Sequence, residues 1–182
     1  MHAVVSGQLD AQAGADTLSV LADTQILLPM SGGQKSWQLA ALFSVGAADL
    51  ALADMRRYWG FQLAQGATTA WEQLDLNTSP PTLWQESLTS RCHGWSAGPS
   101  WLLPRYVLGV APSAPGFAHI RLRPQLGDLD WAAGEVPTPH GNIRIELARG
   151  GGRVVLPYGV TAQVAGRQLG SGEHRLSPGD MS

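Results

Sequence analysis

The spacing of apolar residues changes from a helical period to a strand period near residue 110. Up to Gly109 they recur every three to four positions, which is typical of one face of an α-helix. Beyond it, as in residues 119–123 and 142–147, they alternate with polar residues, which is typical of half-buried antiparallel strands. Helices followed by strands favour an α+β chain. We therefore predict two domains, residues 1–111 and residues 112–182.

Four helices are expected in the first domain, because cap residues and glycines or prolines bracket four amphipathic stretches. We place them at residues 16–28, 37–45, 49–66 and 99–109. The third helix is expected to have one apolar face that consists of Leu52, Met55, Trp59 and Leu63. Pro104 has no backbone N–H and is expected to kink the fourth helix.

A turn-rich segment at residues 67–92 separates the third helix from the fourth, and we expect it to be a long loop. Loops of this length in compact domains are usually functional. The second domain is expected to be a small antiparallel β-sandwich, since glycine-rich turns separate short alternating stretches. We place its strands at residues 119–123, 129–136, 142–147, 153–156, 160–165 and 173–176.

Charge and cysteine content argue against several classes of function. The net charge is −2 and the 12 Lys and Arg residues are spread along the chain, so neither a nucleic-acid surface nor a basic membrane patch is expected. The single cysteine, Cys92, excludes an intrachain disulfide and a thiolate zinc site, and no two histidines have metal-ligand spacing. We expect no cofactor and no metal. The sequence has no evident secretion signal or membrane span, which favours a cytoplasmic protein or a gene that starts further upstream.

Tryptophan is concentrated in one part of the chain. Five of the seven tryptophans lie between residues 59 and 101. Indole rings stack on the apolar C–H faces of sugars, but tryptophan is also a frequent core residue. Both interpretations stay open for Trp71 and Trp95.

Two polar residues of the long loop and its end are the candidates for chemistry. Glu72 lies where the third helix gives way to the loop, and a carboxylate placed beside a water there can act as a general base. On composition alone, a capping or solvated glutamate is the commoner case. His93 lies among small residues before the fourth helix, where its imidazole could donate to a sugar hydroxyl. A structural histidine is the alternative.

Four sequence strings follow one another along the chain: GATTAWEQLD, CHGWSAGP, RYVLGVAPSAPGF and IRLRPQLGDLDWAAGEVPTPHGNIRIEL. In this order they resemble the end of bacterial α-L-rhamnosidases of the inverting type, and the resemblance covers about residues 15–165. The resemblance implies the last helices of an (α/α)6 toroid, a ring of six helical hairpins, followed by a C-terminal antiparallel β-domain.

The resemblance also implies roles for single residues. The glutamate of the first string is the family's proposed general base, which corresponds to Glu72, and the histidine of the second lines the rhamnose subsite, which corresponds to His93. Trp71 and Trp95 stand in the same strings and are expected to contact the substrate. The implied reaction is hydrolysis of terminal α-L-rhamnosides with inversion, in which the base takes a proton from water and an acid protonates the leaving oxygen.

The resemblance is incomplete in one respect that matters for activity. The acidic motif that supplies the family's general acid has no match in residues 1–65, and four helices are too few for a toroid. The sequence therefore predicts a glycoside hydrolase fragment that is inactive alone, with a rhamnose-containing carbohydrate and the missing N-terminal part of the enzyme as partners. Two alternatives stay open: a non-catalytic carbohydrate-binding or interaction module, and a different α-toroid glycosidase or lyase.

Overall fold

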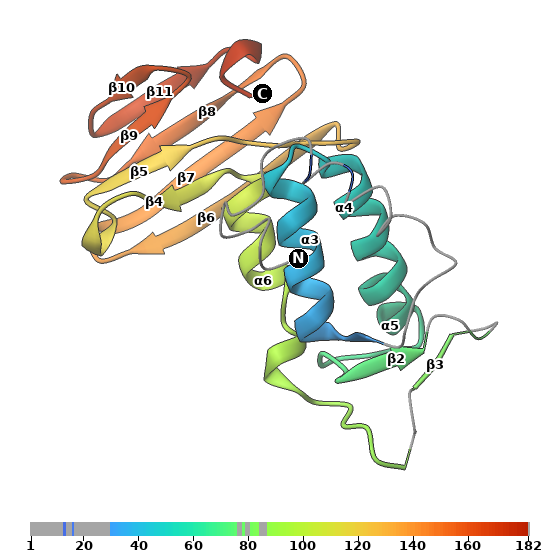
Figure 1. The fold of residues 1–182 in the computed structure, drawn as a ribbon. Helices are drawn as coiled ribbons and strands as arrows, with labels where there is room; N and C mark the ends of the chain where they lie inside the picture. The colour runs from blue at the N-terminus through green and yellow to red at the C-terminus, as the bar shows by residue number, and fades with distance from the viewer. Residues whose placement is uncertain are drawn as a thin grey trace. The chain divides into compact units, whose positions relative to one another are not determined.

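The computed structural model describes residues 13, 16, 30–75, 78, 81–83 and 87–181 of the chain. The chain divides into two compact units, Met1–Trp101 and Leu102–Ser182. The first unit contains the longer helices and a small sheet, and the second contains two four-stranded sheets (Figure 1). Residues 17–28 of the first expected helix lie outside the described residues.

Helix α3 (Gly32–Ser44) begins before residue 37, where the sequence predicted its start. Ser31 is the N-cap: its hydroxyl accepts a hydrogen bond from the Gln34 N–H (3.2 Å), and Gln34 Oε1 accepts one from the Ser31 N–H (3.0 Å). This reciprocal pair is a capping box, which satisfies two backbone donors at once. Ser36 lies inside the helix instead, where its hydroxyl donates to the Gly32 carbonyl (2.6 Å).

The next three segments form one continuous helix: α4 (Ala48–Met55), the π-helical turn η2 (Arg56–Gly60) and α5 (Phe61–Ala64). The helix ends where it was predicted to end, because Gly66 has a φ of +79°. Residues with a side chain rarely adopt that conformation, and glycine commonly terminates a helix in this way.

The π-turn η2 changes which side chains of this helix are buried. A π-turn contains one residue more than an α-turn, so the residues that follow it are rotated relative to an unbroken α-helix. Met55 and Trp59 are buried as predicted, but Leu63 is 70% exposed and Gln62 is only 2% exposed. The prediction of one apolar face that includes Leu63 is therefore wrong.

The predicted long loop contains two short strands, β2 (Gln73–Asp75) and β3 (Thr82–Leu83). β2 pairs antiparallel with β3 and with β1 (Met30–Ser31), which directly precedes α3. Tyr58 connects this sheet to the helix η2, because its side chain is fully buried and forms a hydrogen bond with the backbone of Leu74. Burial raises the pKa of the Tyr58 hydroxyl above its ordinary value, and the hydrogen bond with Leu74 opposes the rise.

The fourth expected helix is present as α6 (Pro99–Leu102) followed by the π-helical turn η4 (Leu103–Val107). Pro104 lies in the π-turn, where the Leu108 N–H donates to the Leu103 carbonyl (2.9 Å). A proline inside an α-helix removes one donor and presses on the carbonyl four residues earlier. The disturbance predicted at Pro104 therefore takes the form of a wider turn.

The second unit is a β-sandwich with strand orders β11-β8-β7-β6 and β10-β9-β5-β4. The first sheet consists of β6 (Trp131–Thr138), β7 (Gly141–Ala148), β8 (Gly151–Leu156) and β11 (Gly172–Leu176). The second consists of β4 (Val110–Pro112), β5 (His119–Leu122), β9 (Thr161–Val164) and β10 (Arg167–Leu169), with the 3-10 turn η5 (Pro115–Phe117) between β4 and β5. Every pairing between these strands is antiparallel except that of β5 with β9. The sequence did not predict β4 and β10, because three residues are too few to show a period.

Alternating side chains from both sheets build one core in this unit. On β7, Ile143, Ile145 and Leu147 are buried while their neighbours are exposed. They pack in the same cluster as Ile120 and Ala162, which lie on the opposite sheet. The α+β fold class, with helices followed by a small β-sandwich, is therefore confirmed. Among the described helices, none is long and apolar enough to cross a membrane.

A buried carboxylate fixes the C-terminal 3-10 turn η6 (Pro178–Asp180) to the sandwich. Asp180 Oδ2 accepts hydrogen bonds from Arg167 (2.6 Å) and from the N–H and the hydroxyl of Ser177 (both 2.8 Å). The hydrogen bond with Arg167 is the largest of the causes that hold the pKa of Asp180 below its ordinary value. The resulting stability is present above the pKa of an unfolded aspartate, about 3.9, and is lost as the pH falls through the lower folded-state pKa.

We expect Asp180→Asn to lower the free energy of unfolding at pH 7 by about 1–3 kcal/mol, since a charge-assisted hydrogen bond is lost. The difference from the wild type should begin to shrink below about pH 4, where the carboxylate becomes protonated in the unfolded chain, and should disappear as the pH falls through the lower folded-state pKa. Asp130→Asn is the matched control, because the Asp130 side chain is 89% exposed in its 3.1 Å pair with Arg149. Urea unfolding at pH 7 and at pH 3 measures both; equal losses for the two substitutions at pH 7 would contradict the assignment.

Candidate functional site

Three segments of the first unit hold the backbone of Glu72. The Gly32 N–H (3.0 Å) and the Ser96 hydroxyl (3.1 Å) both donate to the Glu72 carbonyl. The Glu72 N–H in turn donates to the Ser90 carbonyl (2.9 Å). Glu72 is thus fixed between the start of α3, the end of the long loop and the 3-10 turn η3 (Gly94–Ser96).

The side chains of Glu72 and His93 lie next to each other. The Ser90 N–H donates to Glu72 Oε2 (2.9 Å), and His93 Nδ1 lies 3.7 Å from the same oxygen. This separation is too long for a direct hydrogen bond. Both side chains are partly exposed, 25% for Glu72 and 34% for His93. The backbone also ties the two segments, because the His93 N–H donates to the Ala70 carbonyl (2.9 Å).

The two candidate tryptophans differ in their surroundings. Trp95 is 56% exposed, and its ring lies 4.4 Å from the imidazole of His93, measured between centroids. Trp71 is only 8% exposed, and the guanidinium of Arg91 covers its ring at 5.3 Å. An exposed indole beside His93 is thus available at Trp95, whereas the Trp71 ring offers little surface.

Gln62 connects the helix to the loop that carries Glu72. Its Oε1 accepts a hydrogen bond from the Trp71 N–H (2.9 Å), one residue before Glu72. Its Nε2 is buried and has no hydrogen-bond partner among the described residues. A buried amide donor without a partner is uncommon in folded proteins and costs free energy.

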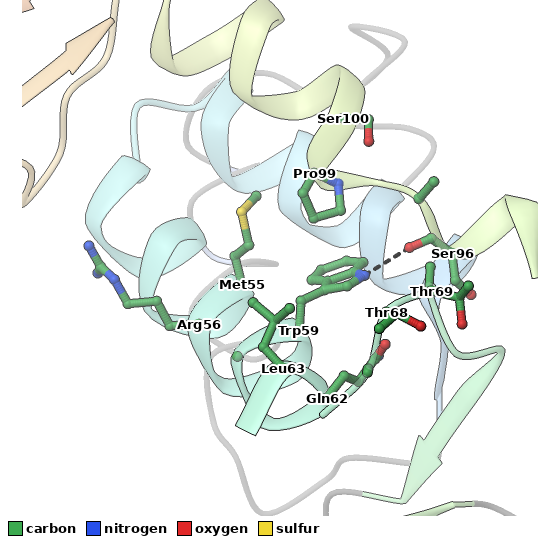
Figure 2. Close-up of a pocket in the computed structure, with 14 residues that line it drawn as sticks. Met55, Arg56, Trp59, Gln62, Leu63, Thr68, Thr69, Ser96, Pro99 and Ser100 are labelled. Atoms are coloured by element: carbon green, nitrogen blue, oxygen red, sulfur yellow. Dashed lines mark hydrogen bonds between the residues drawn. The ribbon is translucent and has the colours of Figure 1, made fainter. Parts of the chain in front are cut away.

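A groove of about 540 Å³ lies between the helix, the start of this loop and the η3–α6 segment (Figure 2). We call it the apolar groove. Most of its surface comes from apolar atoms, and its lining includes Met55, Trp59, Gln62, Leu63, Thr68 and Pro99. The Trp59 indole N–H donates to the Ser96 carbonyl (2.8 Å), which fixes the indole against η3. Neither Glu72 nor His93 lines the apolar groove.

Two glycines allow the segments around Glu72 to approach one another. A Cβ added at Gly32 would collide with the side chain of Ser96, and one at Gly98 would collide with the hydroxyl of Ser36. The close contact between α3 and the η3–α6 segment therefore requires glycine at these positions.

Within the part of the chain that the structure describes, no three His, Cys, Asp or Glu side chains are grouped so that they could hold a metal ion. The pair formed by Glu72 and His93 offers two donors, whereas protein metal sites commonly use three or four. The arrangement suits proton transfer and hydrogen bonding to a polar ligand better than metal binding.

The structure brings together three of the four residues that the sequence singled out: Glu72, His93 and Trp95. The fourth, Trp71, has a buried ring. Sequence reasoning missed Gln62 and the Ser96 hydroxyl as residues that position Glu72. A glutamine on an amphipathic helix carries no such signal, since only the π-turn places it inside.

Two family profiles match consecutive parts of the chain. The profile described as bacterial alpha-L-rhamnosidase 6 hairpin glycosidase domain matches residues 35–107. The profile described as bacterial alpha-L-rhamnosidase C-terminal domain matches residues 109–174.

Individual relatives agree with these matches. The chain is 28% identical over 110 residues to an alpha-L-rhamnosidase of Alteromonas sp. (strain LOR), covering 58% of this chain and 12% of that protein. It is 32% identical to the GH78 family rhamnosidase of Bacillus sp. GL1, with a TM-score of 0.65, covering 79% of this chain and 15% of that one. The fold is also similar to the alpha-L-rhamnosidase of Aspergillus terreus, at 20% identity and a TM-score of 0.76, covering 91% of this chain and 21% of that one. The chain thus spans a small part of each relative.

We expect Gln62→Leu to lower the free energy of unfolding by about 1–2 kcal/mol, because the Trp71 N–H loses its acceptor while removal of the unpartnered Nε2 offsets part of the loss. Gln65→Leu is the matched control, since Gln65 is exposed on the same helix end. Urea unfolding followed by tryptophan fluorescence compares the two. The same stability for both variants would show that the Gln62 hydrogen bond contributes nothing.

Proposed function

Because the chain belongs to the bacterial α-L-rhamnosidase family, we propose that it forms the C-terminal part of a glycoside hydrolase that removes terminal α-L-rhamnosyl groups with inversion. The observation that carries this proposal is the pairing of Glu72 with His93 at 3.7 Å on a partly exposed surface. A second support is that hydrogen bonds fix the backbone of Glu72 from three segments.

In this proposal Glu72 is the general base. The Ser90 N–H orients its carboxylate, and one quarter of the side chain is open to solvent, so a water can approach it. The carboxylate takes a proton from that water as the water attacks the anomeric carbon. An inverting enzyme needs a second carboxyl group about 6.5–9.5 Å away to protonate the leaving oxygen.

His93 and Trp95 are the proposed substrate contacts. The imidazole of His93 lies beside the carboxylate and can donate to a hydroxyl of the sugar. Rhamnose is a 6-deoxy sugar with an apolar methyl group, and the exposed ring of Trp95 offers an apolar surface of the kind on which such groups pack. Trp71 contributes through its backbone N–H, by which Gln62 positions the loop.

The general acid is proposed to come from a part of the enzyme outside residues 1–182. Asp54 is an unsuitable acid, because it is engaged in a 2.9 Å ion pair with the buried Lys35. We therefore propose that residues 1–182 hydrolyse no rhamnoside by themselves and that the remaining part of the enzyme completes the site.

A chimera tests this function. Residues of this chain replace the aligned segment of the Bacillus sp. GL1 rhamnosidase, and hydrolysis of 4-nitrophenyl α-L-rhamnoside is measured. Glu72→Gln should lower kcat by about 10²–10⁴-fold, because the general base is lost. Proton NMR of the unmodified chimera should show the β-anomer of rhamnose as the first product.

Glu146→Gln is the control for this experiment, because Glu146 lies on an exposed strand face of the second unit. It should leave kcat within about twofold. Full activity of Glu72→Gln, or the α-anomer as first product, would contradict the proposed mechanism. Rhamnose binding that survives Glu72→Gln in a folded chimera without turnover would favour a non-catalytic carbohydrate-binding module instead.

A further inference from the structure

The apolar groove has the character of a contact surface within a larger fold. Met55, Trp59 and Pro99 form apolar walls, and Leu63 stands at the groove with 70% of its side chain exposed (Figure 2). Removing an apolar side chain of this size from water is favourable, and the gain grows with the apolar area that is covered. An exposed leucine beside a preformed apolar groove is therefore a site where further burial is favourable.

Gln62 ties the groove lining to the neighbouring loop. It lines the groove, is 2% exposed, and accepts a hydrogen bond at Oε1 from the Trp71 N–H. Its Nε2 is closed to solvent and pairs with no described residue, so the groove as it stands gives no access to this donor. The apolar walls and Leu63 are therefore the surface that an occupant contacts.

The length of the matched domain indicates what the occupant is. The matching profile describes a domain of six hairpins, and it matches residues 35–107 of this chain. In the described residues one helical hairpin, α3 with α4–α5, already extends from Gly32 to Ala64. Six such hairpins need far more chain than this match supplies, and the chain covers only 12% of the Alteromonas relative. Most hairpins of the domain therefore lie elsewhere.

We propose that the apolar groove is the docking site for a helical hairpin from the remaining part of the catalytic domain, which inserts an apolar side chain beside Leu63. This inference rests on the proposed function, because it assumes that the chain completes a larger rhamnosidase. It goes beyond that function by assigning a surface and a chemistry to the contact.

The docking site and Glu72 share one side chain. Gln62 lines the groove, and its Oε1 holds the Trp71 N–H one residue before Glu72. A hairpin that fills the groove packs against this residue. Assembly of the domain therefore helps to position the general base, and Gln62 is a positioning residue.

Cysteine labelling tests the docking site. Leu63→Cys is introduced in a Cys92→Ser background, because Cys92 is itself exposed. Iodoacetamide labelling is then measured by mass spectrometry in the isolated chain and in the chimera with the Bacillus sp. GL1 enzyme. We expect the thiol of the Leu63→Cys variant to be labelled at least tenfold more slowly in the chimera, since the docked hairpin covers it.

Leu50→Cys is the matched control, because Leu50 is 50% exposed on the same continuous helix but does not line the groove. Its labelling rate should change less than threefold between the two forms. The chimera is first shown to be folded by circular dichroism. The proposal is overturned if the Leu63→Cys thiol is labelled at the same rate in this chimera and in the isolated chain. It is also overturned if the chimera protects the cysteines at positions 63 and 50 equally. If labelling of the Leu63→Cys thiol in the isolated chain becomes slower as the protein concentration rises, the occupant is a second copy of the chain, which also overturns the proposal.

The labelling result is independent of catalysis. The Leu63→Cys thiol should be labelled at the same slow rate in a chimera that also carries Glu72→Gln and in a chimera with the native glutamate. This holds even if the Glu72→Gln chimera turns over no substrate. Protection without activity would thus contradict only the proposed function, and activity without protection would contradict only the docking site.

Discussion

The hydrogen bond between Gln62 Oε1 and the Trp71 N–H is the contact on which the arrangement of the candidate site depends. It exists because the π-turn at Arg56–Gly60 turns Gln62 inward and Leu63 outward. In an unbroken α-helix the phase of these residues would differ, and the leucine would be expected inside. The inversion leaves an exposed leucine and a buried amide donor that no described residue satisfies. The exposed leucine is a feature that a partner surface can cover.

Around that bond, short segments from distant parts of the sequence converge on Glu72. The capped start of α3 supplies the Gly32 N–H, η3 supplies the Ser96 hydroxyl, and the end of the loop supplies the Ser90 backbone. Gly32 leaves room for Ser96, and Gly98 leaves room for Ser36. Most of these contacts hold the Glu72 backbone, and the Ser90 N–H alone holds its carboxylate. Such fixed placement is what the proposed general base needs. The β-sandwich of the second unit has its own core and needs none of these contacts.

The sequence predicted those features that depend on local chemistry. The change of period near residue 110 indicated the α+β class, and the alternation on β7 matched the buried side chains Ile143, Ile145 and Leu147. Features that depend on a single inserted residue or on long-range pairing were not predictable in this way. The π-turn has no sequence signature here, so the burial of Gln62 and the exposure of Leu63 were missed. β2 and β3 were missed because strands of two or three residues show no alternation.

The candidate site shows the same division. The sequence strings placed Glu72 and His93 in one site, and the structure puts them 3.7 Å apart. Their catalytic and binding roles stay proposals that rest on family membership and on this proximity. Burial of the Trp71 ring could not be read from its string, since Trp71 and Trp95 each stand beside a candidate polar residue. In the structure the Trp71 ring is buried with the Arg91 guanidinium over it, whereas the Trp95 ring is exposed beside His93.

Hydrogen exchange at the Trp71 backbone amide of the unmodified chain tests the central claim most directly. If Gln62 is turned inward and holds this amide, NMR should show exchange at least a hundredfold slower than in an unstructured peptide of the same sequence. Exchange at the unstructured rate would mean that Gln62 does not bind the loop and that Glu72 is not fixed as described.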